Sequence, residues 1–289
     1  MKRDTFHAQD GASLAFSDVG TGRPLLALAG FTRNSRDFDY LGRHLHDVRL
    51  IRLDSRGRGE SQWTGADTYT ALQESDDAIA LLDHLAIPRA AVIGSSRGGI
   101  LAMLMAMKAP ARVAGVCLND VGPVMERAGL ERIGAYIGVE PAVTTLEEIA
   151  DRMPQAMPGF HHVPELRWEE ETIRRYVQTE TGIALPYDPD LRLSFQKALA
   201  APPTDAWPLF DACAGVPVAL IRGANSDVLS AGAAAAMAAR RPDLIYAEVP
   251  DRGHTPFLDE PEALAAIREW LDRCSFTAQA APAQQKLAG

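Results

Sequence analysis

The sequence predicts an α/β protein with a mostly parallel sheet of eight strands, helices on both faces and a helical insertion after the sixth strand. Short apolar runs alternate with segments of helical periodicity up to Asp120. Continuous apolar runs of this length are typical of strands that are covered on both faces of a parallel sheet. The alternation stops after Asp120 and resumes at Val218, which indicates an insertion between two strands of one sheet.

The strands and helices can be placed by their periodicity. The predicted strands cover residues 5–9, 14–18, 25–29, 48–53, 90–93, 113–118, 218–222 and 244–249. The first two are joined around Asp10-Gly11, so we expect an antiparallel hairpin at the edge of the sheet. The predicted helices of the sheet domain cover residues 41–45, 69–85, 101–108, 231–240 and 262–271. Pro261 suits the first position of the last helix.

Residues 122–208 differ in composition from the segments on either side. They are rich in Pro, Glu and Arg, and we predict helices over 146–153 and 169–179. An insertion that lies over the carboxyl ends of strands is typical of a lid above a binding site. The predicted sheet domain therefore comprises residues 1–121 and 209–274, and residues 122–208 form a helical cap. The Ala- and Gln-rich residues 275–289 are expected to be a disordered tail.

Composition excludes several classes of protein. The chain has 289 residues and a net charge of −9, without the basic patch that nucleic-acid binding requires. Its three cysteines, Cys117, Cys213 and Cys274, have neither metal-ligand nor disulfide-framework spacing, so they indicate no metal site. No cofactor is expected either, because the serine chemistry predicted below needs none. The N-terminus has no apolar signal region, and no apolar run reaches the roughly 18 residues of a membrane span. These features predict a soluble cytoplasmic protein without a membrane partner, and they are compatible with a homodimer.

The most informative motif is Gly94-Ser95-Ser96-Arg97-Gly98, which matches G-x-S-x-G between a predicted strand and a predicted helix. A sharp strand-to-helix turn holds the central serine at its tip in strained backbone geometry. The two glycines remove the Cβ atoms that would collide in such a turn. We therefore predict Ser96 as a nucleophile, whereas Ser95 lies one position off the tip.

A nucleophilic serine needs a base and an acid that orients the base. His254 follows the strand predicted over 244–249, at the edge of the sheet where ligands bind. Asp227 follows the strand over 218–222, and Asp120 follows the strand over 113–118. We predict the triad Ser96, Asp227 and His254, with Asp120 as the alternative acid. Asp227 is favoured because the acid must reach Nδ1 of the histidine from a neighbouring strand end.

The attack of a serine on a carbonyl creates an oxyanion, which needs N–H donors already in place. In a strand–serine–helix turn, one donor is the amide after the serine and the other comes from the loop after an earlier strand. Here these positions are Arg97 and, in Ala29-Gly30-Phe31-Thr32, the residue Phe31. We predict the backbone amides of Phe31 and Arg97 as the oxyanion donors.

These motifs occur in one order over residues 5–272, together with the turn Asp54-Ser55-Arg56-Gly57-Arg58-Gly59-Glu60-Ser61. As an ordered set they resemble the α/β-hydrolase superfamily, in the lid-bearing branch that includes small-ester and enol-lactone hydrolases. The resemblance implies the α/β-hydrolase fold, a triad in the order Ser, Asp, His, and structural roles for Asp54 and Arg56 in a turn that supports the oxyanion side.

The sequence also departs from many members of that superfamily. Ala29 precedes Gly30 where many relatives have histidine, and Arg97 follows the serine where Met, Gln or Trp is common. The resemblance to haloalkane dehalogenases and epoxide hydrolases does not extend to their chemistry, because those enzymes use aspartate at the position of Ser96.

The function that the resemblance and the triad predict is hydrolysis of a small carboxylic ester or lactone through an acyl-enzyme, of carboxylesterase or lactonase type. Three alternatives remain open at the level of sequence. They are hydrolysis of a carbon–carbon bond in a ring-cleavage product, a cofactor-free perhydrolase, and a hydrolase-fold ligand-binding protein with residual activity.

Two arginines suggest an anionic substrate. Arg97 adjoins Ser96 and Arg33 follows the oxyanion loop, so both guanidinium groups could pair with a substrate carboxylate. The alternative is that Arg97 bonds buried carbonyls or an acid such as Asp120, and that Arg33 is solvated. Large cap side chains either face the substrate or form the core of the cap: Met125, Tyr136, Phe160, Trp168, Tyr176, Phe195 and Trp207. Among them we predict Trp168 and Trp207 as substrate contacts.

Overall fold

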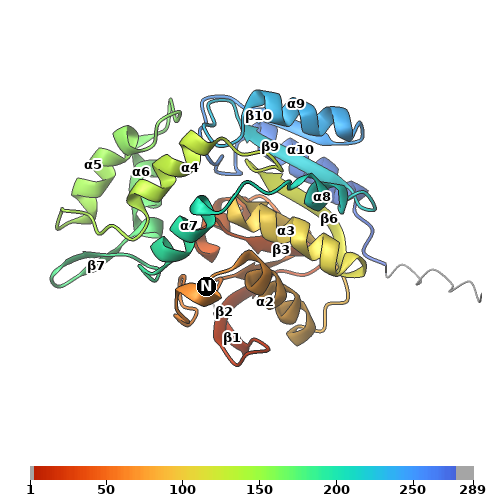
Figure 1. Ribbon diagram of the computed structural model, residues 1–289, viewed down its shortest axis with the longest axis horizontal. Coiled ribbons are helices and arrows are strands. Elements are labelled where there is room, and N and C mark those ends of the chain that lie inside the picture. The colour runs from red at the N-terminus through yellow and green to blue at the C-terminus, as the bar shows by residue number, and fades with distance from the viewer. Residues whose placement is uncertain (1–2, 278–289) are drawn as a thin grey trace, which may run out of the picture.

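The computed structural model describes residues 3–277 and confirms the predicted fold class. Eight strands form one sheet in the order β1-β2-β4-β3-β5-β6-β9-β10 (Figure 1). The predicted edge hairpin is β1 (Asp4–His7) paired antiparallel with β2 (Ser13–Val19). β2 pairs antiparallel with β4, and the remaining neighbours are parallel. The parallel strands are β3 (Arg23–Leu28), β4 (Val48–Leu53), β5 (Ala90–Ser95), β6 (Val113–Asn119), β9 (Val218–Gly223) and β10 (Ile245–Val249).

Helices cover both faces of the sheet. One face packs against α2 (Ala71–His84), α3 (Arg97–Lys108), α8 (Trp207–Asp211) and α9 (Ala231–Arg240). The other packs against α1 (Asp39–Gly42) and α10 (Pro261–Arg273). Successive strand residues point to opposite faces, so Val92 belongs to the first core and Ile93 to the second. This burial on both sides is why the strands are apolar throughout. In the described part of the chain, short 3₁₀ helices lie in the connections: η1 (Ser35–Phe38), η2 (Ala66–Thr68) and η3 (Pro110–Arg112).

The insertion between β6 and β9 lies to one side of the sheet domain (Figure 1). Before α8 it contains α4 (Arg127–Tyr136), α5 (Leu146–Ala156), α6 (Glu165–Arg175), the hairpin β7 (Val177–Thr179) and β8 (Gly182–Ala184), and α7 (Leu191–Ala200). α5 begins with a capping box between Thr145 and Glu148. The helix predicted over 169–179 was wrong at both ends, because α6 begins at Glu165 and ends at Arg175. α6 stops at Arg175 because the β-branched residues that follow pair in the β7–β8 hairpin.

Register brings the strand ends to one edge of the sheet. Ser95 pairs with Asn119 across β5 and β6, and Asn119 pairs with Ile221 across β6 and β9. Gly223 then pairs with Val249 across β9 and β10. The loops that follow β5, β6, β9 and β10 therefore emerge side by side, although they lie far apart in the sequence.

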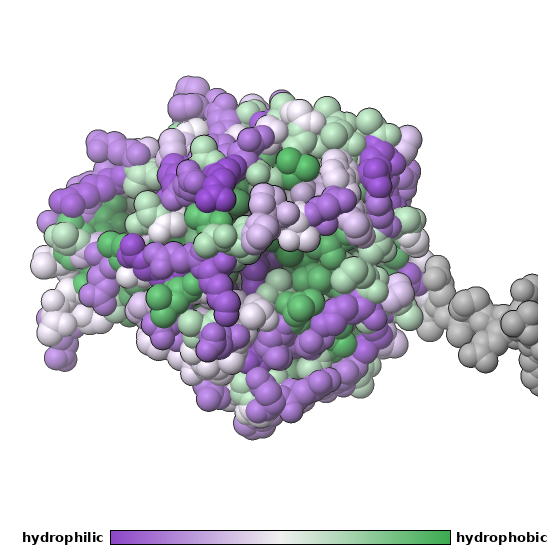
Figure 2. Space-filling model, in the orientation of Figure 1, coloured by the Kyte–Doolittle hydropathy of each residue, from purple (hydrophilic) through white to green (hydrophobic). Residues whose placement is uncertain are grey.

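Within residues 3–277, no helix is long enough and apolar enough to cross a membrane. The face shown in Figure 2 carries hydrophilic and hydrophobic residues intermixed. Of the tail predicted over 275–289, residues 278–289 lie outside the described residues.

The two-sided core makes a prediction about stability. Trp270 of α10 is fully buried and its Nε1 donates to the carbonyl of Pro217 at 3.2 Å. Trp270→Ala should lower the free energy of unfolding by about 3–5 kcal/mol because it leaves a large cavity. Tyr246→Ala is the control, since Tyr246 is 43% exposed on β10 and should cost less than about 1 kcal/mol. Urea unfolding of both variants measures the difference, and equal losses would contradict it.

Candidate active site

The turn between β5 and α3 has the geometry that its sequence predicts. Ser96 lies at the turn with a φ of 50° and a ψ of −113°. A Cβ atom at Gly94 would lie 2.2 Å from the backbone of Gly98, and one at Gly98 would lie 1.9 Å from the carbonyl oxygen of Leu28. Both glycines are therefore required by close approach of the helix to the strands. The strained turn presents the Ser96 side chain beyond the strand ends.

A hydrogen-bonded chain joins Ser96 to a histidine and a carboxylate. Oγ of Ser96 lies 2.9 Å from Nε2 of His254, and Nδ1 of His254 lies 2.7 Å from Oδ2 of Asp120. The Asp120 side chain is fully buried and that of His254 is 7% exposed. With Nδ1–H donated to Asp120, Nε2 is left free to accept the hydroxyl proton of Ser96. The arrangement is chemically capable of activating the serine as a nucleophile.

Asp120 is held in place by the neighbouring strand β9. The amide of Gly223 donates to Oδ1 at 2.9 Å, and the hydroxyl of Ser226 donates to Oδ2 at 2.6 Å. The amide of Asp120 itself donates to the carbonyl of Ile221 at 2.7 Å. A buried carboxylate without partners would be costly, and these donors offset that cost. They also orient one oxygen toward His254.

The prediction that Asp227 orients His254 is wrong, and the alternative acid Asp120 takes that place. The carboxylate of Asp227 accepts hydrogen bonds from Nε and Nη2 of Arg132 in the cap at 2.5 and 2.9 Å. Burial by itself would raise the pKa of Asp227, but the bonds from Arg132 hold it below its ordinary value. The sequence places both acids after strands that neighbour one another. The turn from Gly223 to Ser226 directs the Ser226 hydroxyl to Oδ2 of Asp120, whereas the Asp227 carboxylate bonds Arg132.

The two predicted oxyanion amides lie at suitable positions. Arg97 is the first residue of α3, where amides lack partners inside the helix. Phe31 follows Gly30 directly beyond β3 and lines the same cavity as Ser96. Among the hydrogen bonds formed by residues 3–277, none has the amide of Phe31 or of Arg97 as its donor. Both N–H groups are therefore available to an oxygen placed beside Ser96.

A cavity of about 90 Å³ adjoins Ser96, His254 and Phe31. Arg33 and Arg175 enter its wall, each paired with carboxylates. Nε of Arg33 donates to Asp37 at 2.8 Å and its Nη2 to Glu171 at 3.3 Å, while Nη2 of Arg175 donates to Glu171 at 2.9 Å. Burial would raise the pKa of Glu171, but Arg175 and Arg33 lower it. Two cations and two anions thus form the polar end of the cavity.

The prediction that the Arg97 side chain contacts substrate is not supported. Its Nε donates to the buried Glu74 at 2.9 Å and its Nη2 to the carbonyl of Tyr69 at 3.4 Å. This agrees with the alternative that it bonds a buried acid and carbonyl groups, although the acid is Glu74 and not Asp120. The guanidinium is turned toward α2 because a buried carboxylate needs cationic partners. Arg33, in contrast, is not solvated but lines the cavity.

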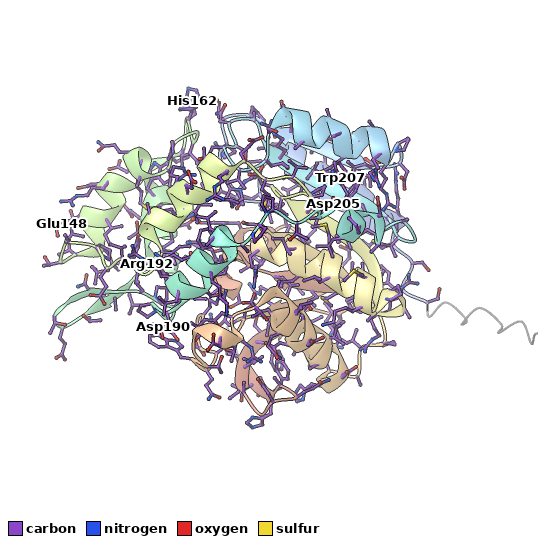
Figure 3. All side chains as sticks on the ribbon, in the orientation of Figure 1. Glu148, His162, Asp190, Arg192, Asp205 and Trp207 are labelled. Carbon is purple, nitrogen blue, oxygen red and sulfur yellow. The ribbon has the colours of Figure 1, made fainter. Side chains whose placement is uncertain are left out.

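The structure also corrects both predicted tryptophan contacts. Trp207 lies in α8 on the sheet domain (Figure 3), where its ring packs on Phe210 and under the guanidinium of Arg240. Trp168 lies in α6, in the core of the cap beside Phe160. Of the seven large side chains predicted for the cap, Tyr136 is the one that lines the cavity beside Ser96.

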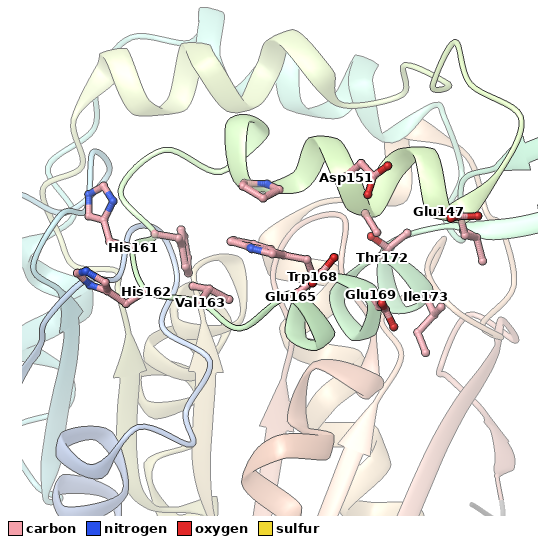
Figure 4. Close-up of a pocket in the computed structure, with 14 residues that line it drawn as sticks. Glu147, Asp151, His161, His162, Val163, Glu165, Trp168, Glu169, Thr172 and Ile173 are labelled. Carbon is pink, nitrogen blue, oxygen red and sulfur yellow. The ribbon is translucent and has the colours of Figure 1, made fainter.

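A larger groove of about 1010 Å³ lies between α5 and α6 (Figure 4). Trp168 forms part of its wall and the carboxylates Glu147, Asp151, Glu165 and Glu169 surround it. Thr172 of α6 borders this groove, whereas Glu171 and Arg175 border the cavity of Ser96. α6 therefore lies between the two spaces, and Ser96 adjoins the smaller cavity and not the groove. Within residues 3–277, no three or more His, Cys, Asp or Glu residues are grouped to hold a metal ion.

Several residues that line the cavity were not predicted from the sequence, among them Arg175, Glu171 and Tyr40. Arg175 and Glu171 lie on one face of α6, four residues apart, a spacing that favours an ion pair. Tyr40 lines the cavity, and its buried hydroxyl has no hydrogen-bond partner among residues 3–277. Burial raises the pKa of Tyr40, so it stays a phenol. The spacing in α6 was a usable signal, whereas nothing near Tyr40 in the sequence indicates a site.

Known proteins resemble this chain over most of its length. The family model of the alpha/beta hydrolase family matches residues 25–267. A 3-hydroxybutyrate-oligomer hydrolase of Cupriavidus necator is 36% identical over 267 residues, which cover 89% of this chain and 90% of the relative. A 2-(acetamidomethylene)succinate hydrolase of Mesorhizobium japonicum is 30% identical and covers 90% of this chain and 92% of the relative. The crystal structure of an alpha/beta hydrolase from Novosphingobium aromaticivorans is 38% identical, with a TM-score of 0.87 over 94% of this chain and 98% of that one.

The hydrogen bonds predict different effects for the two aspartates. Asp120→Asn should slow the reaction of Ser96 with a fluorophosphonate by roughly a thousandfold or more, because the amide favours the wrong tautomer of His254. Asp227→Asn is the control and should change the rate little, since its partner is Arg132. Intact-mass measurement of the labelled protein gives both rates. A slower reaction in the Asp227 variant than in the Asp120 variant would contradict the assignment.

Proposed function

The chain belongs to the alpha/beta hydrolase family, and we propose that it is a serine hydrolase that cleaves a small carboxylic ester through an acyl-enzyme. The observation that carries the proposal is the hydrogen-bonded chain from Ser96 through His254 to Asp120. Each of the three occupies a loop at the carboxyl edge of the sheet, where ligands bind in α/β folds.

The proposed reaction follows from the atoms that meet at this edge. Nε2 of His254 accepts the Ser96 proton while Oγ attacks the ester carbonyl. The amides of Phe31 and Arg97 donate to the oxyanion, and His254 returns the proton to the departing alkoxide. Water, deprotonated by His254, then attacks the acyl-enzyme and releases the acid and Ser96. Asp120 stabilises the imidazolium that forms in both steps.

The polar end of the cavity supports a substrate that carries a free carboxylate. Arg33 and Arg175 each use Nε and Nη2 on carboxylates of the protein, and no hydrogen bond within residues 3–277 uses their Nη1 atoms. A substrate carboxylate would accept from these free N–H groups, and guanidinium suits this role by its planar set of donors. Tyr40 lines the same wall, and its buried hydroxyl has no partner within residues 3–277.

We therefore propose short esters of 3-hydroxy acids as the substrate class. A dimer of 3-hydroxybutyrate combines one ester bond with one free carboxylate, which suits a site with Ser96 at one end and arginines at the other. The relative from Cupriavidus necator, whose name states that it hydrolyses 3-hydroxybutyrate oligomers, covers 89% of this chain and supports the choice.

The role of the serine is tested by a panel of chromogenic esters with different acyl lengths and charges. Ser96→Ala should reduce ester hydrolysis by roughly 10³-fold or more, because no covalent intermediate can form. Ser95→Ala is the matched control, since its hydroxyl accepts from Asn119 and should be dispensable. Hydrolysis that survives in Ser96→Ala, or tight ligand binding without turnover in the parent protein, would contradict the proposal.

The carboxylate preference is tested with the 3-hydroxybutyrate dimer and its methyl ester. Arg175→Met should raise KM for the free acid roughly tenfold or more, the value of one charge-assisted hydrogen bond, and leave KM for the methyl ester unchanged. Arg192→Met is the control, because Arg192 lies on α7 in the same cap (Figure 3) and does not line the cavity. An equal rise for both substrates would mean that Arg175 supports the cap without recognising the carboxylate.

A further inference from the structure

Behind the oxyanion loop lies a buried cluster of charged side chains that the reaction does not use. Arg58 is 1% exposed, in the turn after β4, and Glu74 of α2 is also 1% exposed. Nη1 of Arg58 donates to Oε1 of Glu74 at 2.9 Å, and Nε of Arg97 donates to Oε2 at 2.9 Å. Burial would raise the pKa of Glu74, but the two arginines lower it, so the carboxylate stays charged.

Arg58 also contacts the residue whose amide is expected to face the oxyanion. Its Nε donates to the carbonyl oxygen of Phe31 at 2.7 Å. Its guanidinium carbon lies 5.0 Å from the centre of the Phe31 ring, and that of Arg97 lies 5.4 Å from the same ring. The cluster therefore contacts both the backbone and the side chain of Phe31.

The peptide units on either side of Phe31 are both restrained. The carbonyl of Gly30 belongs to the same planar unit as the Phe31 amide, and it accepts from the amide of Arg33 at 3.0 Å. The carbonyl of Phe31 belongs to the next unit and accepts from Arg58. With both units held, the direction of the Phe31 N–H is set before a substrate arrives. Such preorganisation is what makes an oxyanion donor effective.

The base of the cluster is anchored to the fold. Nη1 of Arg58 also donates to the carbonyl of Arg56 at 2.6 Å. The turn that carries Arg58 is joined to the cap, where the amide of Gly59 donates to the carbonyl of Pro186 and the amide of Asp188 donates to the carbonyl of Gly57. Arg58 is therefore held at several points before it contacts Phe31.

We propose that Arg58, held by Glu74, is a positioning residue that keeps the Phe31 amide directed at the oxyanion of the transition state. The proposal rests on the proposed serine-hydrolase function. Arg58 touches no substrate and acts through Phe31 alone. Its loss should weaken stabilisation of the transition state and leave binding of the ground state intact.

The test compares Arg58→Lys with Arg56→Lys on an ester substrate. Lysine keeps a positive charge beside Glu74 but lacks the fixed set of donors that reaches Phe31, Arg56 and Glu74 together. Arg56 is the matched control because it is fully buried in the same turn but pairs with Asp10 and Asp77. The concentration of active sites is measured by titration with a fluorophosphonate, so that misfolded protein is not counted when kcat is calculated.

Arg58→Lys should lower kcat per titrated serine roughly ten- to a hundredfold, somewhat less than removal of a whole oxyanion donor. KM should stay unchanged, and the inhibition constant of a boronic acid that forms a tetrahedral adduct on Ser96 should rise in proportion to the loss in kcat. Arg56→Lys should lower the melting temperature and leave kcat per titrated serine unchanged.

If Arg58 has only a structural role, Arg58→Lys will behave like Arg56→Lys. Both variants will then have a lower melting temperature and a lower titrated fraction with an unchanged kcat, and this result would overturn the proposal. If Arg58→Lys does not fold, Glu74→Gln is measured in the same way, and an unchanged kcat there would also overturn it. Failure of this proposal is distinguishable from failure of the proposed function. If the proposed function is wrong, Ser96→Ala retains hydrolysis, whereas a wrong role for Arg58 leaves the effect of Ser96→Ala unchanged.

Discussion

The close approach of α3 to strands β3 and β5 is the constraint on which the rest of the site depends. Two glycines make this approach possible, since a Cβ at Gly98 would lie 1.9 Å from a carbonyl oxygen of β3. The same approach forces Ser96 into a positive φ and leaves the first amide of α3 beside its hydroxyl. One packing contact thus positions both the proposed nucleophile and one of the proposed oxyanion donors. The strain in the turn is offset by the apolar burial of α3 against the sheet.

Ion pairs, and not only apolar side chains, pack around this turn. Glu74 holds Arg58 and Arg97, and Glu171 holds Arg33 and Arg175. Buried pairs contribute little net stability, but removing one partner is costly because it leaves an unpaired charge. Their geometry is therefore well defined. One cluster donates to the carbonyl of Phe31 through Arg58, and the other lines the cavity beside Ser96.

Much of the fold followed from local patterns. Buried strands such as β4 and helices such as α9 begin and end where the sequence predicts, because their apolar periodicity matches burial on two faces or on one. The G-x-S-x-G turn was also predictable, since glycine is required where a Cβ atom would clash with nearby backbone. The end of α6 was not predictable from local sequence, because the hairpin that follows it depends on pairing between β7 and β8.

The sequence by itself determined the fold class, the place of Ser96 at its turn and the presence of His254 on the loop after the last strand. These depend on periodicity and on short-range sterics, which residue types specify directly. Only the tertiary structure decided that Asp120 and not Asp227 orients His254, and that Arg97 turns toward Glu74 while Arg175 reaches the cavity. Such choices depend on which of several similar side chains lies within reach of a partner in the folded chain. A buried charge is directed by its nearest counter-charge, and that neighbour lies on a distant segment of the chain.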